Sequence, residues 1–196
     1  MSRTMIYLAS KSPRRRQLLD LITQDYKVIE VDIPEQWDGA EAPQDYVQRL
    51  ALCKARAGAQ LAVGSSPVLG SDTEVVIHNQ ILGKPRDRGE AIAMLRMLSG
   101  QTHEVYTAVA LAQGNDESLC LNHNRIQFRQ LDLVECESYC NTGEPFGKAG
   151  AYAIQGRAAA FITRLEGSYS GVMGLPLRET RELLKAFIQK PCSHDK

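Results

Sequence analysis

The sequence has no long uninterrupted hydrophobic segment. None approaches the roughly 20 apolar residues that a membrane-spanning helix needs. Met1 to Thr4 lead directly into a predicted strand rather than into the apolar core of a signal peptide. We therefore expect neither membrane insertion nor secretion, and we predict a cytoplasmic protein.

An excess of charge of one sign is also missing. Lys and Arg together number 23, as do Asp and Glu, so the formal net charge of the 196-residue chain is zero. This balance argues against a long nucleic-acid groove but permits a local basic pocket for one nucleotide. The sequence also lacks a G-x-x-x-x-G-K-[ST] loop, which argues against a P-loop kinase or ATPase.

Cysteine and histidine are few and scattered. The five cysteines have neither disulfide-framework nor zinc-ribbon spacing, which fits a reducing compartment. Cys136 and Cys140 stand four residues apart on a predicted helix face, but without a second close pair we interpret them as ordinary half-buried thiols. The four histidines form no H-x-x-x-H motif and are interpreted as turn, strand or tail residues.

The most informative feature present is a basic cluster near the amino end. Residues 5–9 predict a strand, and Ser12 followed by Pro13 predicts the start of a helix, since serine caps helices and proline suits the first helical position. Arginines in a first turn are unusual, because a helix start favours anions, so something negative is expected opposite them. The cluster indicates a polyphosphate pocket, with a solvated basic helix start as the alternative. It comprises Ser10, Ser12, Arg14, Arg15 and Arg16.

Acids and lysines suited to phosphate chemistry recur further along the chain. Glu35 follows the second predicted strand, and Lys54 lies on the apolar stripe of the second predicted helix. Asp72 comes directly after the start of an apolar strand, where an acid costs stability unless it binds something. Lys84 ends a predicted short hairpin on a stiff glycine and proline frame.

Each of these residues has an ordinary explanation when it is taken alone. Glu35 fits a solvated turn residue, and Lys84 fits a surface loop lysine. Together they match what phosphoryl transfer needs: positive groups for the phosphates, a divalent cation, and a carboxylate that orients or deprotonates water. The combination predicts an enzyme that acts on a nucleoside triphosphate.

The second half of the chain alternates predicted strands and helices around a stretch of small residues. In residues 146–156 the glycines and alanines allow close backbone approach, and the Gln155 amide suits the edge of a base because it both donates and accepts. One domain is predicted over 1–188, with a polar tail over 189–196. Predicted elements are a helix over 87–98, strands over 102–112 and 118–128, a helix over 132–140, a strand over 158–165, a turn over 166–171, a strand over 172–175 and a last helix from Pro176.

Several motifs in one order resemble the Maf family of nucleotide pyrophosphatases. They are L-A-S-K-S-P-R-R-R-Q-L-L at 8–19, G-S-D-T at 70–73, G-K-P at 83–85, K-A-G-A-Y-A-I-Q-G at 148–156 and G-L-P-L at 174–177. The resemblance runs from residue 5 to about 188. The arginines after Pro13, Thr73 and the A-Y-x-I-Q-G segment resemble the dTTP/UTP branch, whereas the 7-methyl-GTP branch has Trp after the proline, Gln after the Asp and Ser-Glu-Gly in place of Ile-Gln-Gly.

The resemblance implies both a fold and an activity. The implied fold is a two-lobed α/β structure with a long curved mixed β-sheet flanked by helices and an active cleft between the lobes, usually in a homodimer. The implied activity is hydrolysis of dTTP, UTP or modified pyrimidine nucleotides between the α and β phosphates, with a divalent cation such as Mg²⁺, Mn²⁺ or Co²⁺.

The resemblance also implies roles for individual residues. Asp72 matches the proton acceptor and Glu35 an acidic metal-binding position, so both are expected near the cation. Lys54 and Lys84 match catalytic lysines, while Arg14, Thr73 and Gln155 match the positions linked to base choice. From the basic cluster, the candidates for phosphate binding are Ser10, Ser12, Arg14 and Arg15.

Two positions depart from the family pattern. Glu74 stands where an apolar residue is more usual. Its carboxylate is expected either to act as an additional metal ligand or to perturb the ionisation of Asp72. Pro34 replaces an acid before Glu35, which leaves the metal site with one carboxylate fewer. With the family's reported link to septum formation, these departures leave open a nucleotide-binding regulator of cell division with little turnover.

Overall fold

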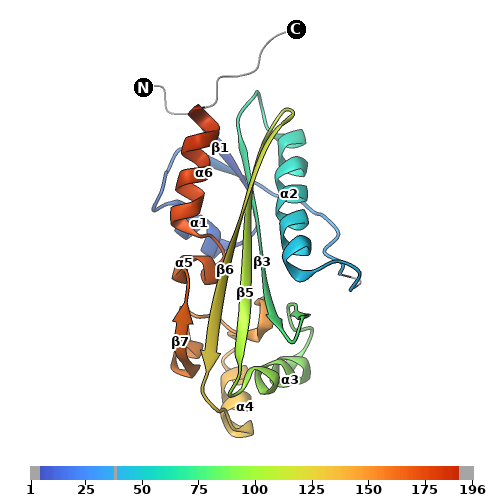
Figure 1. Ribbon diagram of the computed structural model, residues 1–196, viewed down its shortest axis with the longest axis vertical. Helices are drawn as coiled ribbons and strands as arrows, with labels where there is room; N and C mark the ends of the chain where they lie inside the picture. The colour runs from blue at the N-terminus through green and yellow to red at the C-terminus, as the bar shows by residue number, and fades with distance from the viewer. Residues whose placement is uncertain (1–4, 38, 190–196) are drawn as a thin grey trace.

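Three long antiparallel strands run along the long axis of the molecule (Figure 1). They are β3 (Val68–Ile77), β5 (Thr102–Gln113) and β6 (Asp116–Phe128). The computed structural model describes residues 5–37 and 39–189. Within these residues no helix is both long and apolar enough to cross a membrane.

Four shorter strands complete a mixed sheet. They are β1 (Ile6–Ala9), β2 (Tyr26–Ile29), β4 (Gln80–Leu82) and β7 (Ile162–Glu166). The strand order is β2-β1-β3-β5-β6-β7, and β4 pairs with β3 beside this path. Since β1 runs parallel to β2 and β3 while the other pairings are antiparallel, the predicted long mixed sheet is confirmed.

Helices cover both faces of this sheet (Figure 1). Side chains of a strand alternate between its faces, and β5 shows the result. Ala108 and Ala110 pack against the longest helix, whereas Val109 and Leu111 lie in a cluster with residues of the first and last helices. The helices are α1 (Pro13–Leu19), α2 (Pro43–Leu61), α3 (Arg88–Leu98), α4 (Leu133–Asn141), α5 (Tyr169–Met173) and α6 (Leu177–Gln189).

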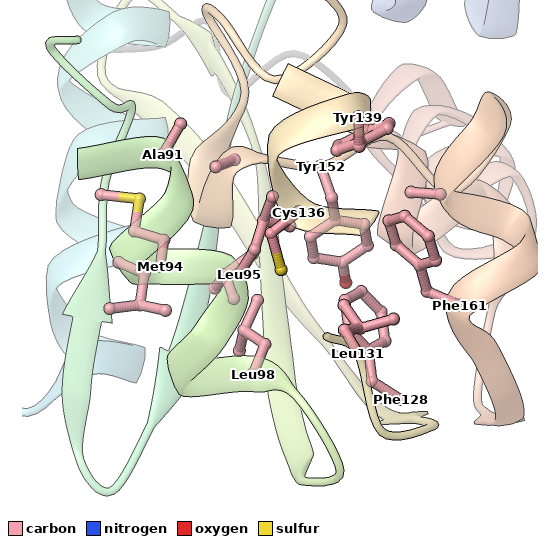
Figure 2. Packing of buried hydrophobic residues seen from close by; sticks show 14 of the residues in the cluster. Ala91, Met94, Leu95, Leu98, Phe128, Leu131, Cys136, Tyr139, Tyr152 and Phe161 are labelled. Carbon is pink, nitrogen blue, oxygen red and sulfur yellow. The ribbon is translucent and has the colours of Figure 1, made fainter. Parts of the chain in front are cut away.

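A separate hydrophobic cluster fills the far end of the sheet, between α3, α4 and two 3₁₀ turns (Figure 2). Its centre is aromatic: the ring centroids of Phe128 and Tyr152 lie 5.0 Å apart, and those of Tyr139 and Phe161 lie 5.2 Å apart. The core therefore has clusters on the two faces of the sheet, one with α2 and one with α1 and α6, and a further cluster around α3 and α4.

The segment before the last helix was predicted incorrectly. The turn predicted over 166–171 and the strand predicted over 172–175 are replaced by the short helix α5. Ser168 caps this helix, since its Oγ accepts from the Gly171 amide at 3.0 Å, and Gly174 ends it with φ of 114°. These local signals outweigh the apolar run that suggested a strand.

Two further boundaries differ from the prediction. The strand predicted over 158–165 is half 3₁₀ turn, Arg157–Phe161, and half β7. The tail predicted over 189–196 begins at the last residue of α6, and the rest of it lies outside the described residues.

Close packing of α2 on β3 requires a glycine at position 70. A Cβ on Gly70 would lie 2.5 Å from the amide nitrogen of Ala55 and closer still to the carbonyl oxygen of Ala51. We expect Gly70→Ala to lower the free energy of unfolding by about 1–3 kcal/mol, because the backbone of α2 must move away from β3. Gly83→Ala is the control, since a Cβ there meets nothing within 4 Å. Equal urea midpoints for the two variants would contradict this packing.

Candidate active site

The centre of β3 has a free edge that opens into a cleft. β1 pairs with β3 only up to Gly70, and β4 pairs with it only from Val75. Residues 71–74 therefore have β5 on one side and, among the described residues, no strand on the other. Side chains from both faces of this segment line one cavity of about 1150 Å³.

All the site residues predicted from the sequence line this cavity. They come from the β1–α1 turn, the first turn of α1, the loop after β2, α2, β3, the segment after β4 and the loop before β7. The structure thus brings together segments that are far apart in the chain, although their individual roles stay predictions. The residues are Ser10, Ser12, Arg14, Arg15, Glu35, Lys54, Asp72, Thr73, Lys84 and Gln155.

A lysine shared by two acids lies on the α2 side of β3. Nζ of Lys54 is 2.6 Å from Oδ1 of Asp72 and 2.6 Å from Oε1 of Glu35. Lys54 comes from the inner face of α2 and is only 9% exposed, which confirms its predicted inward position. Nζ of Lys84 reaches Oε2 of Glu35 at 3.1 Å, so Glu35 joins the two lysines.

Glu35 is held in its ionised form. Burial alone would raise its pKa, but hydrogen bonds and attraction from Lys54 and Lys84 outweigh burial and lower the pKa to about 2. Its contribution to stability is therefore present above the pKa of the unfolded chain, about 4.5, and is lost as the pH falls toward 2. A carboxylate with so low a pKa is a poor proton acceptor but a good ligand for a cation.

Asp72 has one occupied and one available carboxylate oxygen. Its Oδ1 accepts from Lys54, while Oδ2 is buried and has no hydrogen-bond partner within the described chain. The residue as a whole is only 5% exposed. Because a buried oxygen without a partner costs free energy, this arrangement indicates a site prepared for water or a cation.

Glu74 lies two residues further along β3, on the same face as Asp72, and also lines the cleft. Burial, followed by the negative charges of Asp72 and Glu35, raises its pKa well above the ordinary value. Its Oε2 is buried without a partner in the part of the chain that the structure describes. This departure from the family pattern thus places a third carboxyl group in the cleft.

We expect Glu74→Gln to stabilise the protein at neutral pH. A carboxyl group whose pKa is raised by folding contributes stability that is lost as the pH rises through the folded pKa, and glutamine removes this loss. The melting temperature of the variant should exceed that of the wild type by about a few degrees at pH 8 and match it near pH 4. If the difference in melting temperature between the variant and the wild type stayed the same from pH 4 to pH 8, the raised pKa would be contradicted.

The acids of the cleft fit a divalent cation that arrives with phosphate. Carboxylate oxygens of Glu35 and Asp72 are the hard ligands that Mg²⁺ and Mn²⁺ prefer. Lys54 lies between them, and the described residues contain no group of three or more His, Cys, Asp or Glu arranged to hold a metal. Since Mg²⁺ often relies on one or two carboxylates plus substrate phosphates, a preformed metal centre is not required.

The basic cluster faces the same cleft from the start of α1. Ser12 caps the helix as predicted, with its Oγ 3.5 Å from the Arg15 amide, and the helix begins at Pro13. Burial, followed by repulsion from Arg15, lowers the pKa of Arg14, and its Nε is buried without a partner among the described residues. An arginine in this state beside a helix N-terminus favours an anion.

Arg15 is largely occupied by protein contacts. Its Nε donates to the carbonyl oxygen of Gly174 at 2.9 Å, and its Nη2 donates to Oγ1 of Thr73 at 3.1 Å. Arg14 is therefore the stronger candidate for a direct phosphate contact. No sequence signal distinguished these adjacent arginines, because the contacts of Arg15 come from 58 and 159 residues away.

The loop that carries Gln155 is held by a residue that the sequence did not reveal. Glu144 accepts from the backbone amides of Arg157 and Ala158 and from the hydroxyl of Tyr139. Gly156 lets this carboxylate approach, since a Cβ there would collide with it. Glu144 thus positions the exposed Gln155 at the mouth of the cleft without lining the cleft itself.

The fold and the cleft define the class of protein first. The structure is similar to that of the Staphylococcus aureus Ham1 protein, with a TM-score of 0.52 and 13% identity over 94% of this chain and 98% of that chain. It is thus an α/β protein with a Ham1-type fold. The chain belongs to the Maf family, since the family model described as Maf-like protein matches residues 5–187.

Curated relatives match nearly the whole chain. A dTTP/UTP pyrophosphatase of Xanthomonas oryzae pv. oryzae is 51% identical over 187 residues, covering 93% of this chain and 98% of the relative. A dTTP/UTP pyrophosphatase of Saccharophagus degradans is 52% identical over 185 residues, covering 93% of this chain and 88% of the relative. These findings confirm the resemblance on which the site residues were chosen.

Proposed function

We propose that the protein is a nucleoside triphosphate pyrophosphatase that hydrolyses dTTP and UTP to the monophosphate and pyrophosphate. The observation that carries this proposal is one cleft that is lined both by Asp72, whose buried Oδ2 has no partner among the described residues, and by Arg14 at the start of α1, whose Nε has none either. The activity named for the relatives supports the same conclusion.

In this proposal the triphosphate is bound by its charge. Arg14, Ser10 and Ser12 at the start of α1 take the phosphate oxygens, and Lys84 adds positive charge from the segment after β4. Glu35 and Asp72 would hold a divalent cation such as Mg²⁺, Mn²⁺ or Co²⁺. When bound, this cation would neutralise part of the negative charge of the phosphates.

The hydrolytic step needs a carboxylate that accepts a proton from water. Oδ2 of Asp72 takes that proton, while Lys54 holds the other oxygen and fixes the orientation of the carboxylate. The water oxygen bonds to the α-phosphorus, the bond from this phosphorus to the bridging oxygen breaks, and pyrophosphate leaves with the electron pair. Thr73 and Gln155 are assigned to base choice together with Arg14.

The test is an assay of dTTP, UTP, CTP, ATP and GTP with Mg²⁺ or Mn²⁺ in ¹⁸O-labelled water. We expect dTTP and UTP to be preferred, pyrophosphate to be released, and the label to appear in the monophosphate. Release of orthophosphate, or label in pyrophosphate, would refute the assignment of the bond.

The alternative of a division regulator with little turnover is not favoured, because both predicted acids and both predicted lysines line the cleft and the relatives carry an enzyme name. Homodimerisation and a cytoplasmic location stay predictions.

A further inference from the structure

A hydroxyl relay runs inward from Thr73 on the face of β3 opposite to Asp72. Thr73 and Thr107 are directly paired across β3 and β5, and their Oγ1 atoms lie 2.9 Å apart. Oγ1 of Thr107 lies 2.8 Å from the carbonyl oxygen of Gly171 on α5. Because Thr107 is 0% exposed, water does not compete for these contacts.

The protons of the relay can be placed from its chemistry. A threonine hydroxyl carries one proton, and a carbonyl oxygen only accepts. Thr107 must donate to Gly171, because two oxygens 2.8 Å apart without a proton between them would repel each other. The single proton of Thr107 cannot lie toward both the Gly171 carbonyl oxygen and the Thr73 oxygen, so the contact between the two hydroxyls requires Thr73 to donate to Thr107.

Arg15 also donates a hydrogen bond to the Thr73 oxygen. Its Nη2 donates to Thr73 Oγ1 at 3.1 Å. Since arginine is only a donor, this bond uses one lone pair of Thr73. Thr73 thus directs its only proton inward, accepts from Arg15, and keeps one lone pair for the cleft that it lines.

Close backbone packing holds both ends of the relay. A Cβ on Gly171 would collide with the side-chain oxygen of Asn122, so α5 can approach β5 and β6 only with glycine at this position. A Cβ on Gly174 would lie 3.4 Å from both Nε of Arg15 and Oγ1 of Thr73. These contacts place α5 directly beside Thr107 and Thr73.

We propose that Thr107 is a positioning residue for base selection: by taking the proton of Thr73, it leaves Thr73 able only to accept, which selects the N3–H of uracil and thymine. This inference rests on the proposed function, in which Thr73 is assigned to base choice. The N3 atom of cytosine has a lone pair instead of a proton, and this lone pair would meet the lone pair of Thr73. The relay thus makes the enzyme discriminate between UTP and CTP, although Thr107 does not contact the substrate.

Thr107→Val tests this role, since valine keeps the shape and removes the hydroxyl. The Gly171 carbonyl still accepts from the Gly174 amide at 2.9 Å, so the variant should fold. Thr73 can then turn its proton toward the cleft and donate to N3 of CTP. We expect the ratio of kcat/KM for UTP to that for CTP to fall about tenfold, mainly through KM, which corresponds to one hydrogen bond.

Thr107→Ser is the matched control, because it restores the hydroxyl and should restore the wild-type ratio. A second probe is N3-methyl-UTP, which lacks the N3 proton and should be a poor substrate for the wild type. If Thr107→Val left the UTP-to-CTP ratio of kcat/KM unchanged, even with a lower melting temperature, the inference would be overturned. Thr107 would then have a structural role alone. Turnover of N3-methyl-UTP equal to that of UTP would overturn it as well.

These results are distinguishable from failure of the proposed function. If the wild type hydrolysed no pyrimidine triphosphate, the proposed function would fail before any variant was compared, and this inference would fail with it. If the wild type preferred UTP over CTP and only the Thr107 variants behaved otherwise than expected, the relay alone would be wrong.

Discussion

Asp72→Asn is expected to lower kcat for dTTP by about 10²–10⁴-fold, the usual contribution of a positioned general base. Asparagine keeps the shape of the side chain but cannot take a proton from water at neutral pH. The phosphate contacts of the α1 start do not depend on this carboxylate, so affinity for a non-hydrolysable α,β-methylene dTTP, measured without a divalent cation, should change little. Turnover and calorimetric binding, measured on the same preparation, separate the two effects.

The matched control is Asp116→Asn, which makes the same chemical change at an exposed position at the start of β6. It should leave kcat unaltered. If Asp72→Asn were as active as the control, the proton acceptor would have to be sought elsewhere in the cleft. Glu35 is a poor second candidate, since its pKa of about 2 makes it a weak base.

Lys54→Met is expected to have the largest combined effect on stability and activity. Lys54 is the cation that Asp72 and Glu35 share, and Glu74 lies close by on the same strand face. Its removal leaves buried negative charge without its main partner, which typically costs about 3–5 kcal/mol of unfolding free energy at neutral pH. Lys84 still pairs with Glu35, so the loss should lie toward the lower end of that range.

Urea unfolding at pH 7 and pH 4 measures this effect. At pH 4 more of the carboxyl groups are protonated, so the gap between the variant and the wild type should narrow. Added Mg²⁺ should raise the melting temperature of the variant more than that of the wild type, because it can neutralise the same acids. Turnover should fall along with stability, since the orientation of Asp72 is lost.

Lys185→Met, on the exposed side of α6, is the matched control for loss of one lysine charge. It should unfold at the urea concentration of the wild type at both pH values. A Lys54→Met variant that behaved like this control would mean that the acids in the cleft do not depend on the shared lysine.

Local sequence signals predicted the elements that local interactions stabilise. The Ser12 cap with Pro13 set the start of α1, and the alternating pattern around Gly114 predicted the long hairpin of β5 and β6. Both features depend on contacts between residues close in the chain. The segment 166–175 shows the limit, because a turn over 166–171 and a strand over 172–175 were predicted although a serine cap and a left-handed glycine make its centre a helix.

The residue types alone indicated the chemistry of the site. The resemblance to a family then assigned roles in that chemistry to individual residues. Hydroxyls, arginines, lysines and acids at strand ends and on one helix face already indicate phosphate chemistry. Nothing in the residue types shows that Lys54 joins Asp72 to Glu35, or that Arg15 binds the backbone at Gly174. Those pairings depend on how α2 and α5 pack on the sheet.

What the sequence determined by itself was therefore the secondary structure of most of the chain and the chemical character of the cleft, because capping, periodicity and side-chain charge are local properties. Only the tertiary structure decided which arginine stays free, which oxygen of Asp72 is available, and which way the Thr73 hydroxyl points. The reason is physical: each of these depends on a donor or acceptor supplied by a distant segment, as with Gly171, whose carbonyl reaches Thr107 from 64 residues away.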